Sequence, residues 1–286
     1  MRHIGSRLRG GRSGIDTLAT VGCAGVLVAV ASVVLGQTRP SGGLPAGAHP
    51  LSVKDASQLA EIHQAMVIFA GEWGGLLPRP GLINRLPVEV GGKPQRIPGR
   101  GEEDVTLNTT ANLYSSLIAQ NYFAPAQVVS PVERSPKVSV CGSYDYDQYD
   151  PAEGVYWDPH FKADLRRGSH ASYAHLLLFG KRADAQWRDT MDPKFPVLGN
   201  RGPKDGKLDP SSYTCGPHGN WAGNIVYNDN HVEFEVTTTP SGLFFQSGEA
   251  KKPDNIFAVD DGPRGRDVVL TFTKKMTVDG PLLQHD

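Results

Sequence analysis

Residues 218–236 read HGNWAGNIVYNDNHVEFEV, and this stretch decides the fold class. Two apolar runs flank Asp229-Asn230, and both residue types tolerate the positive φ angles of tight turns. We therefore predict a β-hairpin with a two-residue turn at Asp229-Asn230. In that register one face is wholly apolar and carries Ile225, Tyr227, Val232, Phe234 and Val236. The other face carries Val226, Asn228, His231, Glu233 and Glu235. The unmixed apolar face supports this register, because a slip of one residue exchanges the faces of a strand.

The N-terminal region has the composition of a membrane anchor. Residues 1–14 contain four arginines and no acidic residue, and residues 17–38 contain no charged residue. Roughly 20 apolar residues in a helix span a bilayer core of about 30 Å. We predict a basic leader at 1–14 and one transmembrane helix at 15–36, with the N-terminus in the cytoplasm because of the arginines. The alternative is a cleaved signal peptide ending near Ala29-Val30-Ala31.

A Pro/Gly-rich linker is predicted at residues 37–51, followed by an exported domain at 52–286. A first helix begins at an N-cap, Ser52 or Asp55, and ends at the glycines of 71–75. Apolar residues on one face of this helix recur at intervals of three or four: Leu59, Ile62, Met66 and Phe69. A second helix is predicted at 108–120, with Leu113, Leu117 and Ile118 on its buried side.

The rest of the domain is predicted to be rich in strands. Residues 76–103 are rich in Pro and Gly and indicate a surface loop with a short hairpin at Gly91-Gly92. Short apolar runs between turns follow at 138–140, 173–179, 225–227, 232–236, 256–259 and 268–273. Helices first and strands afterwards indicate an α+β fold: an N-terminal transmembrane helix, then helices packed on an antiparallel β-sheet.

Charge and motifs argue against two broad classes of function. The chain has 29 basic and 30 acidic residues, so no net field favours nucleic acid. It contains no Gly-x-Ser-x-Gly, His-Glu-x-x-His, Walker or dinucleotide-binding glycine pattern. We therefore expect no enzyme, and a secreted hydrolase of unfamiliar type is the least favoured alternative.

Two features favour a different class, an exported ligand-binding module. Asp145, Asp147 and Asp150 form an acidic loop, and Ca²⁺ takes about six to eight oxygen ligands. Calcium is thus the one candidate cofactor. The alternative, which is the commoner case, is an acidic loop that is simply solvated. Trp157, Trp187 and Trp221 are candidates for a glycan-binding face, although core packing is the default for tryptophan.

Cysteine and histidine suggest two further sites. Export places Cys141 and Cys215 in an oxidising compartment, where they either pair as a disulfide or stay as buried thiols. A metal cluster is conceivable in the hairpin stretch at His218, Asp229, His231 and Glu233. We favour the simpler interpretation, in which Asp229 shapes the turn.

The hairpin stretch resembles the C-terminal signature of bacterial prepilin-type proteins with the H-X9-DG domain. That pattern is His, a Gly-rich spacer, Asn-Val-Leu-Phe/Tyr, then Asp-Gly-His-Val, an acidic or polar residue and an aromatic. The matching residues here are His218, Gly219, Gly223, Asn224, Ile225, Val226, Tyr227, Asp229, His231, Val232, Glu233 and Phe234. Two departures are a spacer of ten residues between His218 and Asp229, and Asn230 in place of the Gly.

The resemblance implies a pilin-like fold and a structural, non-enzymatic role in a type II secretion or type IV pilus-like system. It implies a single-pass protein of the bacterial inner membrane, with the domain in the periplasm or at the cell surface and other pilin-like or secretion-system subunits as partners. Processing would follow Gly14 and leave Ile15 first. Ala19 stands where the family has Glu, so a minor pseudopilin or an anchored relative fits better than a major pilin.

Overall fold

The computed structural model describes residues 50–83, 87–90, 93–96, 102–148, 150, 155–207 and 221–286. These belong to the second of two units in the chain, Pro40–Asp286, whereas the first unit is Met1–Arg39. The predicted leader and transmembrane helix lie outside the described residues, as does most of the predicted linker. Among the helices of the described part, none has the length and apolar character needed to cross a bilayer.

The first described helix, α2, spans Pro50–Glu72. Its predicted apolar face is confirmed, since Leu59, Ile62, Met66 and Phe69 are all buried. The predicted start is wrong, because the helix already includes Pro50, which we had assigned to the linker. Proline suits the first turn of a helix, where its missing N–H leaves no hydrogen bond unmade. Asp55 therefore lies inside the helix and caps nothing.

A glycine pair ends α2 as predicted. Gly74 has a φ of 64°, and the Gly75 N–H donates to the Ala70 carbonyl over 2.8 Å. This is the Schellman arrangement, in which a left-handed residue lets the chain satisfy the last helical carbonyls. Just past the helix, Trp73 stacks on Phe69 with ring centroids 5.0 Å apart.

The second predicted helix is confirmed as α4, Thr110–Ala119. Thr109 caps it by accepting a hydrogen bond from the Asn112 N–H over 3.2 Å. The three residues predicted to face inward, Leu113, Leu117 and Ile118, are fully buried.

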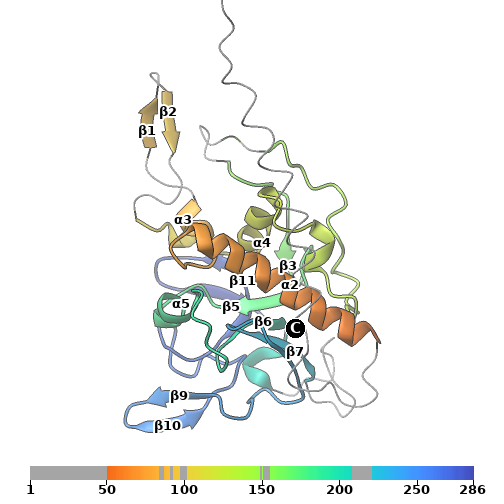
Figure 1. Ribbon diagram of the computed structural model, residues 1–286, viewed down its shortest axis with the longest axis vertical. Coiled ribbons are helices and arrows are strands. Elements are labelled where there is room, and N and C mark those ends of the chain that lie inside the picture. Colours follow the sequence, from red (N-terminus) through yellow and green to blue (C-terminus); the bar gives the residue numbers. More distant parts are fainter. Residues whose placement is uncertain are drawn as a thin grey trace, which may run out of the picture. The chain divides into compact units, whose positions relative to one another are not determined.

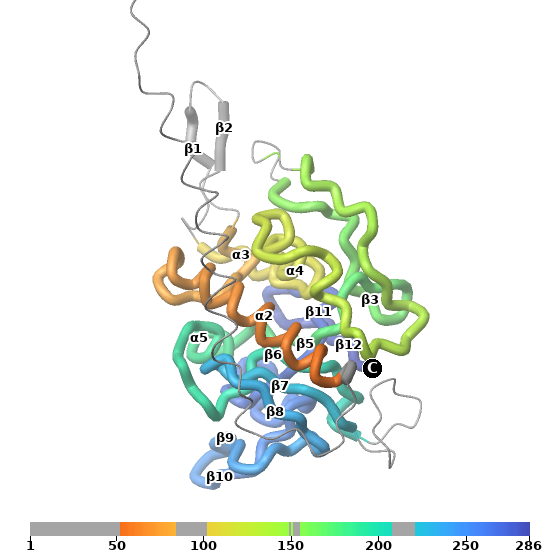
Figure 2. Tube along the Cα trace, turned by 45° about the vertical axis from the view of Figure 1, so that its right-hand side comes forward, coloured from red at the N-terminus to blue at the C-terminus, as the bar shows by residue number. Residues whose placement is uncertain are grey.

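A six-stranded sheet forms the other layer, in the order β12-β11-β5-β6-β7-β8. Its strands are β5 (Tyr173–Leu176), β6 (Pro196–Asn200), β7 (Gly223–Tyr227), β8 (Val232–Glu235), β11 (Leu270–Met276) and β12 (Pro281–Gln284). Every neighbouring pair is antiparallel. Figure 2 shows β12 at one end of this series and β8 at the other.

Helix α2 lies across this sheet and contacts β6, β7 and β8, while α4 contacts β11 (Figure 1). Apolar side chains of both helices and of the sheet form one core. The described part is thus an α+β arrangement with helices on an antiparallel sheet, as expected for this region.

Smaller elements fill the connections. They are α3 (Pro80–Ile83), α5 (Lys181–Gln186), the strands β1 (Pro87–Val90), β2 (Lys93–Arg96), β3 (Ala163–Asp164), β4 (Gly168–Ser169), β9 (Phe244–Ser247) and β10 (Ala250–Pro253), and the 3₁₀ turns η2 (Val105–Leu107), η3 (Pro125–Val128) and η4 (Lys204–Gly206). The predicted hairpin at Gly91-Gly92 is confirmed, because Val90 pairs with Lys93. The predicted surface loop is wrong at its start, where Leu77 and Arg79 are buried. Residues 138–140 and 256–259 form no strand of two or more residues.

The hairpin of residues 223–235 is present, but its predicted turn is wrong by one residue. Val226 pairs with Val232 and Ile225 with Glu233. The Asn230 N–H donates to the Tyr227 carbonyl over 2.9 Å, and the Tyr227 N–H donates to the His231 carbonyl over 3.0 Å. With Asn230 at a φ of 71°, this is a three-residue loop built from a type I turn and one left-handed residue.

The shifted register also overturns the predicted faces of the hairpin. Directly paired residues share a face, so Val226 lies with Val232, whereas Ile225 lies with Glu233. The prediction required positive φ at both Asp229 and Asn230, and only Asn230 has it. All residues of β7 are buried, on both faces of the strand. The pattern of apolar and polar side chains along β7 therefore gives no information about its register.

Candidate functional site

The hairpin residues that match the prepilin signature divide into two groups. Asn224 on β7 bonds directly to α2, whereas Asp229, His231 and Glu233 form a second group at the loop and on β8. Gly223 occupies a crowded position, where a Cβ atom would lie 2.8 Å from the Trp221 ring and 2.9 Å from the Asn200 Cβ.

Asn224 meets a buried aspartate of α2. Its Nδ2 donates to Asp55 Oδ2 over 2.7 Å and to the Ser52 carbonyl over 3.1 Å. The other oxygen of Asp55 accepts from the Tyr173 hydroxyl over 3.0 Å and from the Ser130 hydroxyl. Asp55 has no exposed surface. One carboxylate thus joins α2 to two strands of the sheet and to the segment after η3.

Burial raises the pKa of Asp55 above its ordinary value, although hydrogen bonds from Ser130, Asn224 and Tyr173 oppose the rise. A buried carboxylate is costly unless its oxygens are bonded, and both oxygens of Asp55 have partners. This cluster therefore has the character of a structural link between layers and not of an open reactive group.

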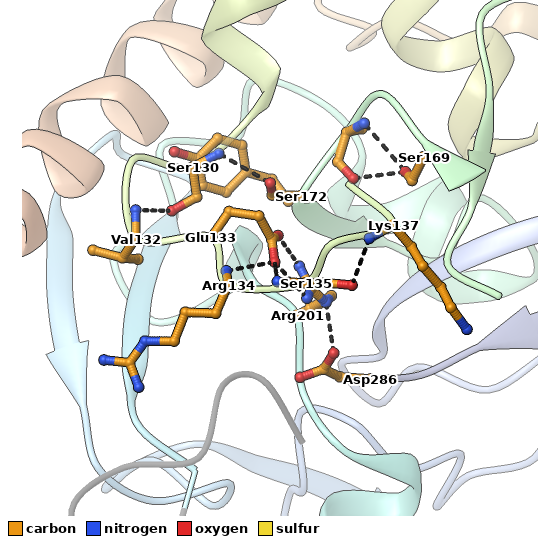
Figure 3. A network of polar contacts seen from close by, with 12 residues as sticks. Ser130, Val132, Glu133, Arg134, Ser135, Lys137, Ser169, Ser172, Arg201 and Asp286 are labelled. Atoms are coloured by element: carbon orange, nitrogen blue, oxygen red, sulfur yellow. Dashed lines mark hydrogen bonds and ion pairs between the residues drawn. The ribbon is translucent and has the colours of Figure 1, made fainter. Parts of the chain in front are cut away.

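A second buried polar network continues from Ser130 (Figure 3). The Ser130 N–H donates to the Ser172 hydroxyl over 3.0 Å. Glu133 pairs with both terminal nitrogens of Arg201, at 2.9 Å for Nη2. Arg201 Nε in turn donates to Asp286 over 2.8 Å. Burial alone would raise the pKa of Glu133, but the Arg201 guanidinium holds it below its ordinary value.

The loop of the hairpin is held by the middle of α2. His63 Nδ1 lies 2.9 Å from Asn230 Oδ1, and Asn230 Nδ2 donates to Gln64 over 3.3 Å. Burial lowers the pKa of His63 to about 4, so the ring is neutral at pH 7 and its Nδ1–H donates to the amide oxygen. Asn230 therefore serves both as the left-handed residue of the loop and as a link to the helix.

Asp229, His231 and Glu233 form a small cluster at the loop and on β8. Asp229 Oδ1 accepts from the His231 N–H over 3.2 Å and also bonds His231 Nδ1. His231 Nε2 lies 3.7 Å from Glu233, and its ring stacks on Tyr227 at 4.4 Å. Across the described ranges, no three His, Cys, Asp or Glu side chains come together as metal ligands. The fourth residue of the conceivable metal cluster, His218, lies outside them.

The acidic loop is organised by its own hydrogen bonds. Asp145 accepts from the Asp147 N–H over 3.0 Å and from Gln148 Nε2 over 3.0 Å. These two bonds lower the pKa of Asp145, and the bond from Gln148 has the larger effect on it. Asp150 pairs through its backbone with Val155. In the part of the chain that the structure covers, this loop contributes to no ligand cluster, and calcium binding stays a prediction.

Two tryptophans predicted to pack in the core do so. Trp187 and Trp221 are 0% and 3% exposed. Their indole nitrogens donate to the carbonyls of Pro78 and Arg201, over 2.8 and 3.0 Å. Trp157 is tied to Asn112 over 3.0 Å. With two of the three candidate rings inside the core, they form no shared glycan-binding face.

Several predicted sites fall outside the described residues. Cys141 is buried, but its predicted disulfide partner Cys215 is not described, so the disulfide stays a prediction. The processing site at Gly14 and Ile15 is likewise outside the described part of the chain.

Asp55 and His63 were not identified as site residues from the sequence, although a signal for them exists. Asp55 precedes Leu59 by four residues, and His63 follows it by four. Both polar residues therefore lie on the apolar face of the helix, where a buried polar side chain needs a specific partner.

Comparison with known proteins gives no relative. No protein-family model matches the chain, and neither a curated protein nor a solved structure shows significant similarity to it.

Proposed function

We propose that this chain is a membrane-anchored, exported pilin-like protein, which acts as a structural or assembly component and not as an enzyme. Its partners are other pilin-like or secretion-system subunits at the inner membrane. The proposal depends on the predicted apolar span at 15–36 and on the helix that follows it.

The observation that carries the proposal is the attachment of α2 to the hairpin. Helix α2 begins at Pro50, soon after the predicted span, and lies on the antiparallel sheet (Figure 1). Asn224 and Asn230, both in the stretch that resembles the prepilin signature, bond Asp55 and His63 of that helix. A domain fastened to the helix nearest its anchor suits a structural subunit.

The buried polar groups fit the same role. Asp55 bonds Ser130, and Glu133 pairs directly with Arg201. The side chains of Asp55, Glu133 and Arg201 are at most 7% exposed. Polar networks of this kind fix the relative position of layers when each member has partners. A reactive site would instead need groups that reach a substrate.

Spheroplast proteolysis of the full-length chain in a bacterial host tests the proposal. We expect the protein in the carbonate-resistant membrane fraction, with its domain cleaved by added protease while a cytoplasmic marker stays intact. Leu27→Arg with Val30→Arg should abolish membrane retention, because each arginine costs about 3 kcal/mol at the centre of a spanning helix. Leu27→Ala is the matched control and should behave as wild type. A soluble wild-type protein, or one resistant to protease in spheroplasts, would contradict the proposal.

A further inference from the structure

The two end strands of the six-stranded sheet offer unpaired backbone groups. Along an antiparallel strand, residues whose N–H and C=O groups face the neighbouring strand alternate with residues whose groups face away from it. In β8, His231 faces β7, because it is hydrogen-bonded to Tyr227. Val232 and Phe234 therefore direct their N–H and C=O groups away from β7. At the start of β12, Gly280 faces β11, because it exchanges backbone hydrogen bonds with Thr277. By the same alternation, Leu283 directs its N–H and C=O groups away from β11. For these three outward residues, no backbone partner lies among the described residues.

The directions of these end strands match each other. All neighbours in the sheet are antiparallel, and the sheet has six strands, so β8 and β12 run in opposite directions. A second copy placed beside the first in the same orientation therefore presents β12 antiparallel to β8. The alternation of the sheet then continues across the junction without interruption.

The charges near the two edges are opposite. Glu233 and Glu235 lie on β8. Among the described residues neither forms an ion pair with a lysine or arginine, and the nearest ring nitrogen is His231 Nε2, 3.7 Å from Glu233. At the other edge Lys275 pairs with Leu282 of β12 and is exposed. The ion pair of this strand within the described residues belongs to its neighbour Lys274, which lies 2.6 Å from Asp164. Following the strand pairs across the sheet, with the bulge in β11 included, places Lys275 on the same face as Glu233 and Glu235.

Exposed apolar side chains flank both edges. Val236 follows β8 and is 63% exposed, and Leu282 on β12 is 55% exposed. An exposed, uncovered strand edge is a template for pairing with another chain, and added strands bind through main-chain hydrogen bonds.

We propose that copies of this chain associate edge to edge, with β8 of one copy paired to β12 of the next. The contact joins two different surfaces, so it is heterologous and does not close on two copies. This inference deepens the assembly role proposed above, but it does not depend on the membrane anchor.

Sedimentation velocity of the full-length chain in mild detergent, over a range of protein concentrations, tests the contact. We expect species larger than a dimer at high concentration, which become smaller at high salt as charges are screened. Reversing the edge charges, either with E233K and E235K together or with K275E, should weaken association about two- to fivefold. Glu249→Lys changes charge in the exposed turn between β9 and β10 and is the matched control.

Mixing supplies the decisive comparison. Each charge-reversed protein should associate more weakly than wild type when alone, and the two should associate more strongly when mixed, because each junction between the two variants joins opposite charges. Melting temperatures show whether each variant is folded. If the double variant is unfolded, the comparison of K275E with wild type still tests the contact. A monomer at all concentrations, or association that edge-charge reversal leaves unchanged, would overturn the inference. If the protein fails the spheroplast test but still shows charge-dependent association, the proposed edge contact stands and the proposed membrane anchor is wrong.

Discussion

Replacing Asp55 with alanine should destabilise the domain strongly. The substitution removes the acceptor of three buried donors: the hydroxyls of Ser130 and Tyr173 and Nδ2 of Asn224. A buried donor left without a partner costs about 1–3 kcal/mol. Asn224 keeps its bond to the Ser52 carbonyl, so we expect a total loss of about 3–5 kcal/mol. That is a large part of the roughly 5–15 kcal/mol that stabilises a typical domain.

Thermal unfolding followed by circular dichroism measures this effect. For a domain of this size, 1 kcal/mol corresponds to roughly 2–4 °C in Tm, so D55A should lower Tm by about 6–20 °C. Lys54→Ala, on the exposed side of the same helix turn, is the control and should change stability by less than about 0.5 kcal/mol. If D55A and K54A melt alike, Asp55 does not link the helix to the sheet.

A double-mutant cycle isolates the bond between layers. D55A and N224A remove the two ends of one hydrogen bond, so their effects should fail to add by about 0.5–3 kcal/mol. Additive losses would mean that the two residues act independently, and the proposed attachment of α2 through the hairpin would lose its main support.

Three further outcomes follow from the structure. Asn230→Ala should destabilise by about 1–3 kcal/mol in urea unfolding, because a left-handed residue and the bonds to His63 and Gln64 are lost; Asn230→Gly should lose only the bonds, and equal losses would exclude backbone strain. Burial raises the pKa of Asp254 in the folded domain to about 7. Since the folded domain binds this proton more tightly than the unfolded chain does, the protonated carboxyl contributes its full stabilisation below about pH 4, and this contribution is lost as the pH rises through about 7. Asp254→Asn should therefore raise Tm at pH 8 by the equivalent of about 1–4 kcal/mol and change it little at pH 4; an equal change at both values would contradict this. Gly223→Ala should lower Tm, since its Cβ meets the Trp221 ring at 2.8 Å; a wild-type Tm would show that the ring moves freely.

The helices could be predicted because their faces are distinct. In α2 and α4 the apolar residues recur at helical spacing, and those positions are the buried ones. The start of α2 was missed because Pro50 resembles a linker residue in a Pro/Gly-rich run. Only the structure shows that the helix begins at the proline.

The register of the hairpin could not be read from its sequence. Asp229-Asn230 suits both a two-residue turn and a three-residue loop, and the two choices differ by one residue in register. Strand β6 was overlooked for a related reason. Pro196, Gly199 and Asn200 indicate a turn in isolation, yet Gly199 is needed where the Asn224 carbonyl would lie 3.1 Å from a Cβ atom.

The partners of the polar residues were beyond sequence reasoning. Asp55 is separated by 75 residues from Ser130 and by 169 from Asn224. A polar residue on an apolar helix face indicates that some partner exists, but folding alone decides which. The hairpin stretch could be singled out from the sequence, whereas the bonds of Asn224 and Asn230 to α2 became visible only in the structure.

The first residue of the protein recovered from its native membrane tests the proposed function most directly. Edman sequencing or intact mass should show a chain that begins at Met1 or Ile15, retains residues 15–36 and resists extraction by alkaline carbonate. A soluble mature protein that begins beyond residue 36 would contradict membrane anchoring, and the pilin-like role with it.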